Sequence, residues 1–444
     1  MFRDTIYALS SGNLPSAVAV VRLSGPHVRE VLTTLVGSVP EPRQLVLATL
    51  RDLDGGVIDR GFVSYFAAPA SFTGDDSAEF QVHGSIAVIA ALFRTFAALP
   101  GLRTAEAGEF ARRAHVNGKF DLTGAEALAD LIEAETEAQR RFAIANASGR
   151  TSELYQSWRE RIIHARAMIE AELDFSDEED IPGAVGSTVW AGIAELRVEI
   201  LEHIKGYRTS EIIRNGYQVA LIGLPNAGKS SLLNALIRRD AAIVSEEPGT
   251  TRDLVVVNLD LCGVKVVLTD TAGLREGAGP VEQQGIERAR EAGRSAQLVL
   301  RLHDLSASSD TTVQDRFENE IKVGTKSDLV GYSDLTTIEV GPLADLKVSA
   351  KTGAGLEALL ERIREHAVTA VSTSQNLIPF RERHVAQLVE AERLLGNALT
   401  EDSLDLELKA ELMRRASLAL GRIIGDVDVE DVLDVIFSRF CIGK

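Results

Sequence analysis

The sequence predicts α/β and all-α structure in one chain: a phosphate-binding α/β domain inserted into a helical domain, with a small α/β domain in front. Three observations predict this. A glycine-rich loop, 223–230, lies between an apolar run typical of a strand and one typical of a helix. Helical periodicity flanks this region on both sides. The first 117 residues mix β-like and helical segments.

Residues 1–117 are expected to form the small α/β domain. Strands are predicted over 17–23 and 60–66, and a helix over 86–99, where Pro and Gly follow. The pattern then becomes helical, and Thr123 and Glu126 have the spacing of a capping box.

Residues 118–215 and 371–444 are expected to be the two parts of the helical domain, around an inserted domain at 216–370. The apolar residues of one helix share a face: Trp158, Ile162, Ala165, Ile169 and Leu173. A second stripe follows the insertion: Val385, Leu388, Leu395 and Leu399. A further helix is predicted over 188–210. Apolar faces need partners, which favours one helical domain; two separate helical domains are the alternative.

The loop at 223–230 has the composition of a P-loop in its proper context. Its glycines let backbone N–H groups turn toward phosphates, and the following helix adds a positive N-terminal end. Lys229 is expected to reach the outer phosphates, and the Ser230 hydroxyl to ligate Mg2+.

Four later segments complete the order of a guanine-nucleotide switch. They are 248–253, which supplies a Thr hydroxyl; 270–273, which opens with an Asp for Mg2+; 325–328; and 349–351. Asp328 can accept hydrogen bonds from guanine N1–H and the exocyclic amine together, which adenine cannot offer. Five boxes in order predict a P-loop (Ras-like) GTPase domain.

The residues expected to contact GTP lie in these boxes or directly beside them. They are Asn226, Ala227, Gly228, Lys229, Ser230, Ser231, Ser245, Glu246, Glu247, Pro248, Gly249, Thr250, Thr251, Asp270, Thr271, Ala272, Gly273, Thr325, Lys326, Ser327, Asp328, Ser349, Ala350 and Lys351. Thr325 departs from the usual Asn. An Asn amide can bond the base and brace the P-loop, and the shorter Thr hydroxyl is expected to do less.

Composition limits the functions open to this chain. Its 444 residues suggest about two to four domains. With a net charge of −18 it is a poor general binder of phosphate backbones, so work on RNA needs a basic patch or a basic partner. Two cysteines, Cys262 and Cys441, fit a reducing cytoplasm. The absence of a signal-peptide pattern and of a spanning apolar run predicts a cytoplasmic protein without a membrane partner.

Together these motifs make the chain resemble the bacterial tRNA-modification GTPases MnmE, also called TrmE, a TrmE-Era-EngA-like family, over essentially its whole length. The GTPase boxes alone would also fit ribosome-assembly GTPases. The blocks that single out this family are 71–74, 83–84, 108–110, 119–122 and the terminal 440–444.

The resemblance implies how hydrolysis is organised. Leu274 stands where Ras-like switches have a water-orienting Gln, and no arginine finger is evident. The family forms a homodimer and hydrolyses GTP when its GTPase domains dimerise in the presence of K+. The K+ ligands would be Asn226, Ser245, Glu247 and Thr250; the Mg2+ ligands Ser230 and Thr251. Glu282 would orient water through a bridging water.

The resemblance also implies a one-carbon folate, 5-formyl-tetrahydrofolate or a related one, bound by the N-terminal domain at its dimer interface. The matching positions are Arg22, Glu79, Lys119 and Lys444. Each by itself is more often part of a surface ion pair. The chain departs from the family's glycine-rich loop at 10–15 and from its His-Gly-Gly at Ser85.

The implied activity is GTP hydrolysis coupled to tRNA modification. With the FAD- and NADH-dependent partner MnmG (GidA), in a heterotetramer-like complex, the family adds a carboxymethylaminomethyl or aminomethyl group to C5 of the wobble uridine of certain tRNAs. Cys441 is either a buried apolar group or a working thiol. The alternatives are a regulatory GTPase switch in ribosome assembly and a folate enzyme regulated by GTP.

Overall fold

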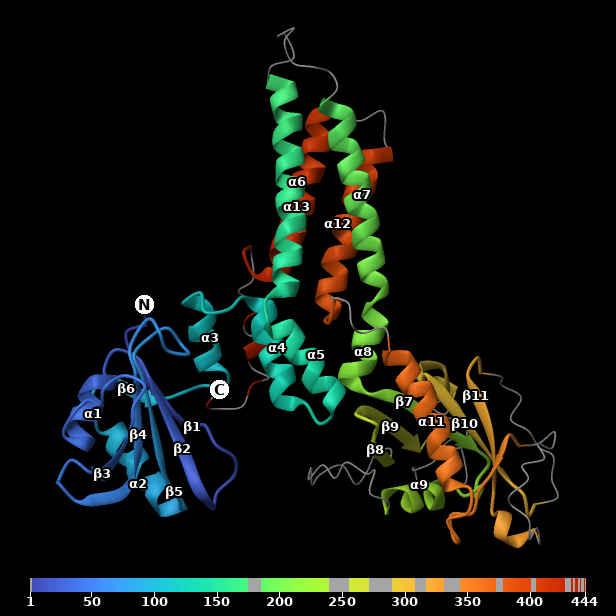
Figure 1. The fold of residues 1–444 in the computed structure, drawn as a ribbon, viewed down its shortest axis with the longest axis horizontal. Helices are drawn as coiled ribbons and strands as arrows, with labels where there is room; N and C mark the ends of the chain where they lie inside the picture. The colour runs from blue at the N-terminus through green and yellow to red at the C-terminus, as the bar shows by residue number, and fades with distance from the viewer. Residues whose placement is uncertain are drawn as a thin grey trace, which may run out of the picture. The chain divides into compact units, whose positions relative to one another are not determined.

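The computed structural model describes most of the chain and divides it into two compact units (Figure 1). The described residues are 2–174, 185–238, 255–270, 290–307, 317–330, 344–372, 378–400, 405–427, 433, 436, 437, 440 and 443. The first unit comprises 1–129, 146–197 and 390–444, and the second comprises 130–145 and 198–389.

The first unit begins with a six-stranded sheet in the order β3-β4-β5-β2-β1-β6. Its strands are β1 (Thr5–Leu9), β2 (Ser16–Ser24), β3 (Leu45–Arg51), β4 (Val57–Phe66), β5 (Ser77–Gly84) and β6 (Leu102–Thr104). Only the β1–β6 pair is parallel. Helices α1 (Val28–Val36) and α2 (Ile86–Ala97) pack against the sheet and bury residues such as Val21 and Phe80. The strands and the helix expected at 17–23, 60–66 and 86–99 are confirmed.

The rest of the first unit is helical. Its elements are α3 (Glu109–Val116), α4 (Leu122–Glu133), α5 (Glu137–Ala147), α6 (Arg150–Asp174), α7 (Val185–Lys205), α12 (Glu382–Thr400) and α13 (Leu406–Ile424), of which α4, α5, α7 and α12 cross the boundary between the units. Helices α6 and α13, from opposite sides of the inserted segment, lie side by side (Figure 1). Trp158, Ile162, Ala165 and Ile169 are buried as predicted, and Leu173 is half-buried.

Two local expectations in the helical region were wrong. The capping box at Thr123 is not formed: helix α4 begins one residue earlier, and Asp121 Oδ1 accepts from the Gly124 N–H at 2.8 Å. The single helix expected over 188–210 is two helices, α7 and α8 (Tyr207–Asn215), separated at Gly206. A Cβ on Gly206 would lie 2.3 Å from Ile378 Cγ2, so a residue distant in sequence packs on this position.

The second unit contains a six-stranded sheet in the order β12-β11-β10-β7-β9-β8. Its strands are β7 (Tyr217–Gly223), β8 (Val255–Leu261), β9 (Val264–Asp270), β10 (Leu298–Asp304), β11 (Glu320–Thr325) and β12 (Leu346–Lys347). All neighbours are parallel except β8 and β9, which form a hairpin. Helices α9 (Lys229–Ile237), α11 (Leu356–Val371) and α8 contact these strands. A parallel sheet under helices needs apolar strands, and Val219–Ile222 of β7 are all buried.

The two units confirm the predicted combination of α/β and all-α structure. In the second unit, strands β9, β7, β10 and β11 are neighbours and run parallel. They end at Asp270, Gly223, Asp304 and Thr325, respectively. Ligands of open parallel sheets bind at this carboxyl edge. Within the described residues, no helix combines the length and the apolar character needed to cross a membrane.

Candidate nucleotide-binding site

The P-loop joins β7 to α9 through backbone conformations that its residues favour. Gly228 precedes α9 with φ +90°, and Asn226, a residue type that tolerates the left-handed region, has φ +64°. A Cβ on Gly223 would lie 2.7 Å from the Leu302 carbonyl oxygen on β10, so only glycine fits there. The loop therefore has the geometry that turns backbone N–H groups toward a phosphate.

Lys229 places its ammonium inside this loop. Its Nζ donates to the carbonyl oxygens of Gly223 at 2.8 Å and Leu224 at 3.0 Å, and the residue is 5% exposed. Burial lowers the pKa of Lys229, and the Asp270 carboxylate opposes that shift. A buried ammonium beside the N-terminus of α9 favours an anion, and the contact of Lys229 with the outer phosphates stays a prediction.

Ser230 and Asp270 meet where a divalent cation is expected. The Ser230 hydroxyl donates to Asp270 Oδ2 at 3.0 Å, and Asp270 is fully buried. The parallel pairing of β7 with β9 sets Asp270 opposite Leu221, next to the P-loop. One carboxylate and one hydroxyl are the hard oxygen ligands that Mg2+ takes beside substrate phosphates, so the residues fit this ion.

The predicted guanine-reading segments also come together. Asp328 lies in a 3₁₀ turn, Ser327–Leu329, just after β11. Its Oδ1 accepts from the Ser349 hydroxyl at 2.7 Å, which links the 325–328 and 349–351 boxes. Lys326, with φ +55°, donates from Nζ to Asp304 Oδ2 at 2.6 Å. Asp304 was not among the expected site residues, although its position at the end of an apolar strand is a signal that marks such sites.

The short side chain of Thr325 reaches the P-loop. It is 3% exposed, and its hydroxyl lies 2.7 Å from the carbonyl oxygen of Ala227 in the P-loop and 3.1 Å from that of His303. Thr325 makes the bracing contact with the P-loop because β10 and β11 bring position 325 close enough for a hydroxyl to reach the loop.

Several expected site residues lie outside the described residues and stay predictions. They are Ser245, Glu246, Glu247, Pro248, Gly249, Thr250, Thr251, Thr271, Ala272, Gly273, Glu282, Cys441 and Lys444, together with Leu274.

The described folate candidates gather around the loop at 67–76 of the first unit. Arg22 and Glu79 are opposite each other on β2 and β5, and Arg22 Nη2 lies 2.8 Å from Glu79 Oε1. The Arg22 guanidinium lies over Phe72, 5.5 Å from its ring centroid. Lys119 Nζ donates to the Pro69 carbonyl oxygen at 2.8 Å. Phe72 falls inside the family block 71–74 and is not one of the four expected folate contacts.

The chain end also approaches this part of the first unit. The Ser10 hydroxyl donates to the Gly443 carbonyl oxygen at 2.8 Å. A Cβ on Gly443 would lie 2.2 Å from the Leu9 carbonyl oxygen, so the tail backbone packs directly on the end of β1.

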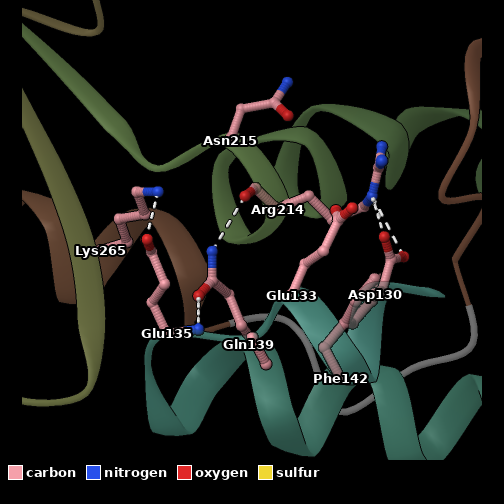
Figure 2. Close-up of a pocket in the computed structure, with 9 residues that line it drawn as sticks. Asp130, Glu133, Glu135, Gln139, Phe142, Arg214, Asn215 and Lys265 are labelled. Carbon is pink, nitrogen blue, oxygen red and sulfur yellow. Dashed lines mark hydrogen bonds and ion pairs between the residues drawn. The ribbon is translucent and has the colours of Figure 1, made fainter. Parts of the chain in front are cut away.

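A cavity of about 260 Å³ in the second unit contains none of the expected site residues (Figure 2). Lys265 of β9 pairs with Glu135, and Arg214 of α8 pairs with Asp130 at 3.2 Å. Gln139 of α5 donates to the Arg214 carbonyl oxygen at 2.9 Å. These groups form ion pairs and hydrogen bonds with one another across the cavity, and the contacts connect the surrounding helices to the sheet (Figure 2).

The fold and site define a P-loop GTP-binding protein, and comparisons narrow the class. A protein-family profile described as the MnmE helical domain matches residues 122–441, and one described as the GTP-binding protein TrmE N-terminus matches residues 5–119. The chain belongs to the MnmE family.

Named relatives match over the whole length. The tRNA modification GTPase MnmE of Chelativorans sp. (strain BNC1) is 54% identical, over 100% of this chain and 98% of that protein. That of Mesorhizobium japonicum is 53% identical, over 99% of each. Among solved structures, a variant of Era from Aquifex aeolicus bound to GDP and AlF4− is 22% identical, covering 40% of this chain and 66% of that chain with a TM-score of 0.26.

Proposed function

We propose that this chain is a GTP hydrolase that acts in the modification of the wobble uridine of tRNA. The proposal of GTP hydrolysis rests on the Ser230–Asp270 contact beside Lys229. Asp328, the expected reader of the guanine base, follows another strand of the same sheet. Water attacks the γ-phosphorus, the bond to the β,γ-bridging oxygen breaks, and GDP and phosphate leave. Lys229 neutralises charge on the outer phosphates. Ser230, Asp270 and Thr251 would hold Mg2+, which would supply positive charge against the phosphates.

The proposed activator of this hydrolysis is K+ at a GTPase-domain dimer. Leu274 has no group that polarises water, so another side chain has to place the nucleophile. Glu282 has that role in the proposal, through a bridging water. Asn226, Ser245, Glu247 and Thr250 would hold K+, which would supply positive charge of the kind that an arginine finger supplies.

GTP hydrolysis is expected to be at least about tenfold faster in KCl than in NaCl at equal ionic strength, since one electrostatic stabiliser of a transition state contributes on the order of a hundredfold. Turnover in the two salts is the measurement, and Asn226→Ala is the variant expected to lose the difference. Equal rates for the unchanged protein would remove the K+ mechanism.

The proposed tRNA role rests on the family and on the first unit. Arg22, Glu79, Lys119 and Lys444 are the proposed contacts of 5-formyl-tetrahydrofolate or a related one-carbon folate, in a homodimer. Arg22, Glu79 and Lys119 gather around one loop, which supports a shared ligand. The proposed partner is the FAD-dependent MnmG, and a chain of net charge −18 fits a division of labour in which this partner holds much of the tRNA.

A deletion strain supplied with the unchanged gene or with Cys441→Ser tests this role. We expect loss of the C5 modification of wobble uridine on deletion, recovery with the unchanged gene, and no recovery with Cys441→Ser. The reason is that Cys441 stands three residues before Lys444 in the sequence, and a cation close to a thiol makes the thiol more reactive. Nucleoside analysis of total tRNA is the readout, and GTPase activity and thermal melting of the purified variant are the controls.

The outcomes separate the alternatives. Unchanged wobble uridines in the deletion strain would contradict the proposed tRNA role and favour the ribosome-assembly switch. Full recovery with Cys441→Ser would remove Cys441 from the chemistry. A large decrease in the melting temperature of Cys441→Ser would assign Cys441 to packing.

A further inference from the structure

Guanine offers more than one edge to a protein, and Asp328 is matched to only one of them. Its carboxylate suits the N1–H and amino edge, and Ser349 orients it through the 2.7 Å hydrogen bond. The opposite edge carries N7, an acceptor that needs a donor. Within the 325–328 box, Thr325 is the side chain that contacts the P-loop, which leaves it as the candidate donor to N7 when Asp328 takes the other edge.

The Thr325 hydroxyl has a single proton, and the P-loop already uses it. The acceptors at 2.7 and 3.1 Å are both main-chain carbonyl oxygens, of Ala227 and His303, so the hydroxyl acts as donor to them. A Thr hydroxyl carries one O–H, whereas an Asn amide carries two N–H groups and can serve a carbonyl and a base together. At 3% exposure the side chain is also enclosed.

The surroundings keep Thr325 in this position. A Cβ built on Gly228 would lie 3.5 Å from both Cβ and Oγ1 of Thr325, so the side chain packs on the turn that precedes α9. The next residue, Lys326, has its ammonium 2.6 Å from Asp304 Oδ2. Thr325 therefore has no second donor to offer N7, and one N–H of Lys326 is held by Asp304.

We propose that this chain selects guanine without a side-chain hydrogen bond to N7, because within the 325–328 box Thr325 serves as a brace of the P-loop and Asp328 provides the side-chain recognition of the base. The inference rests on the proposed GTPase function and specifies its ligand: the site accepts guanine nucleotides in which N7 is replaced by C–H. A chain with Asn at position 325 would distinguish these nucleotides from natural ones.

The test compares GDP with 7-deaza-GDP on the full-length protein, by displacement of a fluorescent GDP. For the unchanged protein we expect the two dissociation constants to agree within about twofold. For Thr325→Asn we expect 7-deaza-GDP to bind about threefold to tenfold more weakly than GDP, the range of one hydrogen bond. A threefold or larger loss in the unchanged protein, or equal binding by a folded Thr325→Asn variant, would overturn the proposal.

Thr325→Val is the matched control, since it keeps the shape and removes the hydroxyl. Loss of the Ala227 contact should weaken GDP and 7-deaza-GDP by the same factor, about threefold to tenfold, and leave their ratio near one. A changed ratio would mean that the hydroxyl contacts the base, which overturns the proposal even when Thr325→Asn does not fold.

ADP is measured in parallel. Binding of ADP as tight as that of GDP would contradict guanine selectivity itself, which is a separate failure.

Discussion

Replacing Asp270 with alanine is expected to reduce Mg2+-supported GTP hydrolysis by a hundredfold to a thousandfold, on the order of the loss of one preorganised electrostatic contact. Asp270 is fully buried at the end of β9, and its Oδ2 accepts from the Ser230 hydroxyl at 3.0 Å. The substitution removes the carboxylate that balances both a bound Mg2+ and the nearby ammonium of Lys229. The hydroxyl of Ser230 alone is a poor substitute for that charge.

The measurement is kcat as a function of Mg2+ concentration. Asp270→Asn separates charge from shape, because it keeps the volume and a hydrogen-bond acceptor but removes the negative charge, and we expect it to lose nearly as much activity. Glu291→Ala, which removes an exposed carboxylate of the same unit, is the control and should be unchanged. A kcat within twofold of the unchanged protein for Asp270→Asn would show that the charge has no catalytic role.

Replacing Arg113 with alanine is expected to destabilise the first unit by about 3–5 kcal/mol, the usual effect of breaking a buried ion pair. Arg113 has a fully buried side chain. It donates to the Asp4 carbonyl oxygen at 2.8 Å and to Glu109 Oε1 at 2.9 Å, and it lies over the Phe2 ring at 4.4 Å. Alanine leaves the Glu109 carboxylate, 9% exposed, with Arg103 as its remaining cation.

Tryptophan fluorescence during urea unfolding reports on this unit, because the chain has two tryptophans, Trp158 and Trp190, and both belong to it. Arg414→Ala is the matched control: Arg414 pairs with Glu411 on the surface of α13 and should cause no measurable shift. Equal unfolding midpoints for the Arg113 and Arg414 variants would contradict the structural role of the buried pair.

The same network predicts the direction of a pH effect. Burial by itself raises the pKa of Glu109, but hydrogen bonds from Arg103, the Glu106 N–H and Arg113 lower it below its ordinary 4.5. A carboxyl group with a lowered folded-state pKa stabilises the fold above its unfolded-state pKa. That contribution disappears as pH falls through the folded-state value. The free energy of unfolding should therefore decrease below about pH 4.5, and less steeply for Arg113→Ala.

The phosphate site could be read from local sequence because its geometry is local. A strand, a turn with Gly223 and Gly228, and a helix that begins at Lys229 follow one another within a few residues, so the motif specifies backbone conformation and chemistry together. The positions of Asp270 and Asp328 at the carboxyl edge of the sheet could also be predicted from the sequence, because Asp270 ends one recognisable strand and Asp328 follows another.

Contacts between distant segments were decided only by the tertiary structure. The hydroxyl of Thr325 reaches Ala227 across 98 positions because β11, β10 and β7 are neighbours, and no periodicity predicts that distance. Ile378, distant in sequence, packs on Gly206 between α7 and α8. Local sequence determines backbone preference and chemical type, whereas the partner of a side chain depends on which surfaces meet when apolar faces are buried. For that reason the amino-acid sequence determined the class of site in this protein, and packing decided what Thr325 does within it.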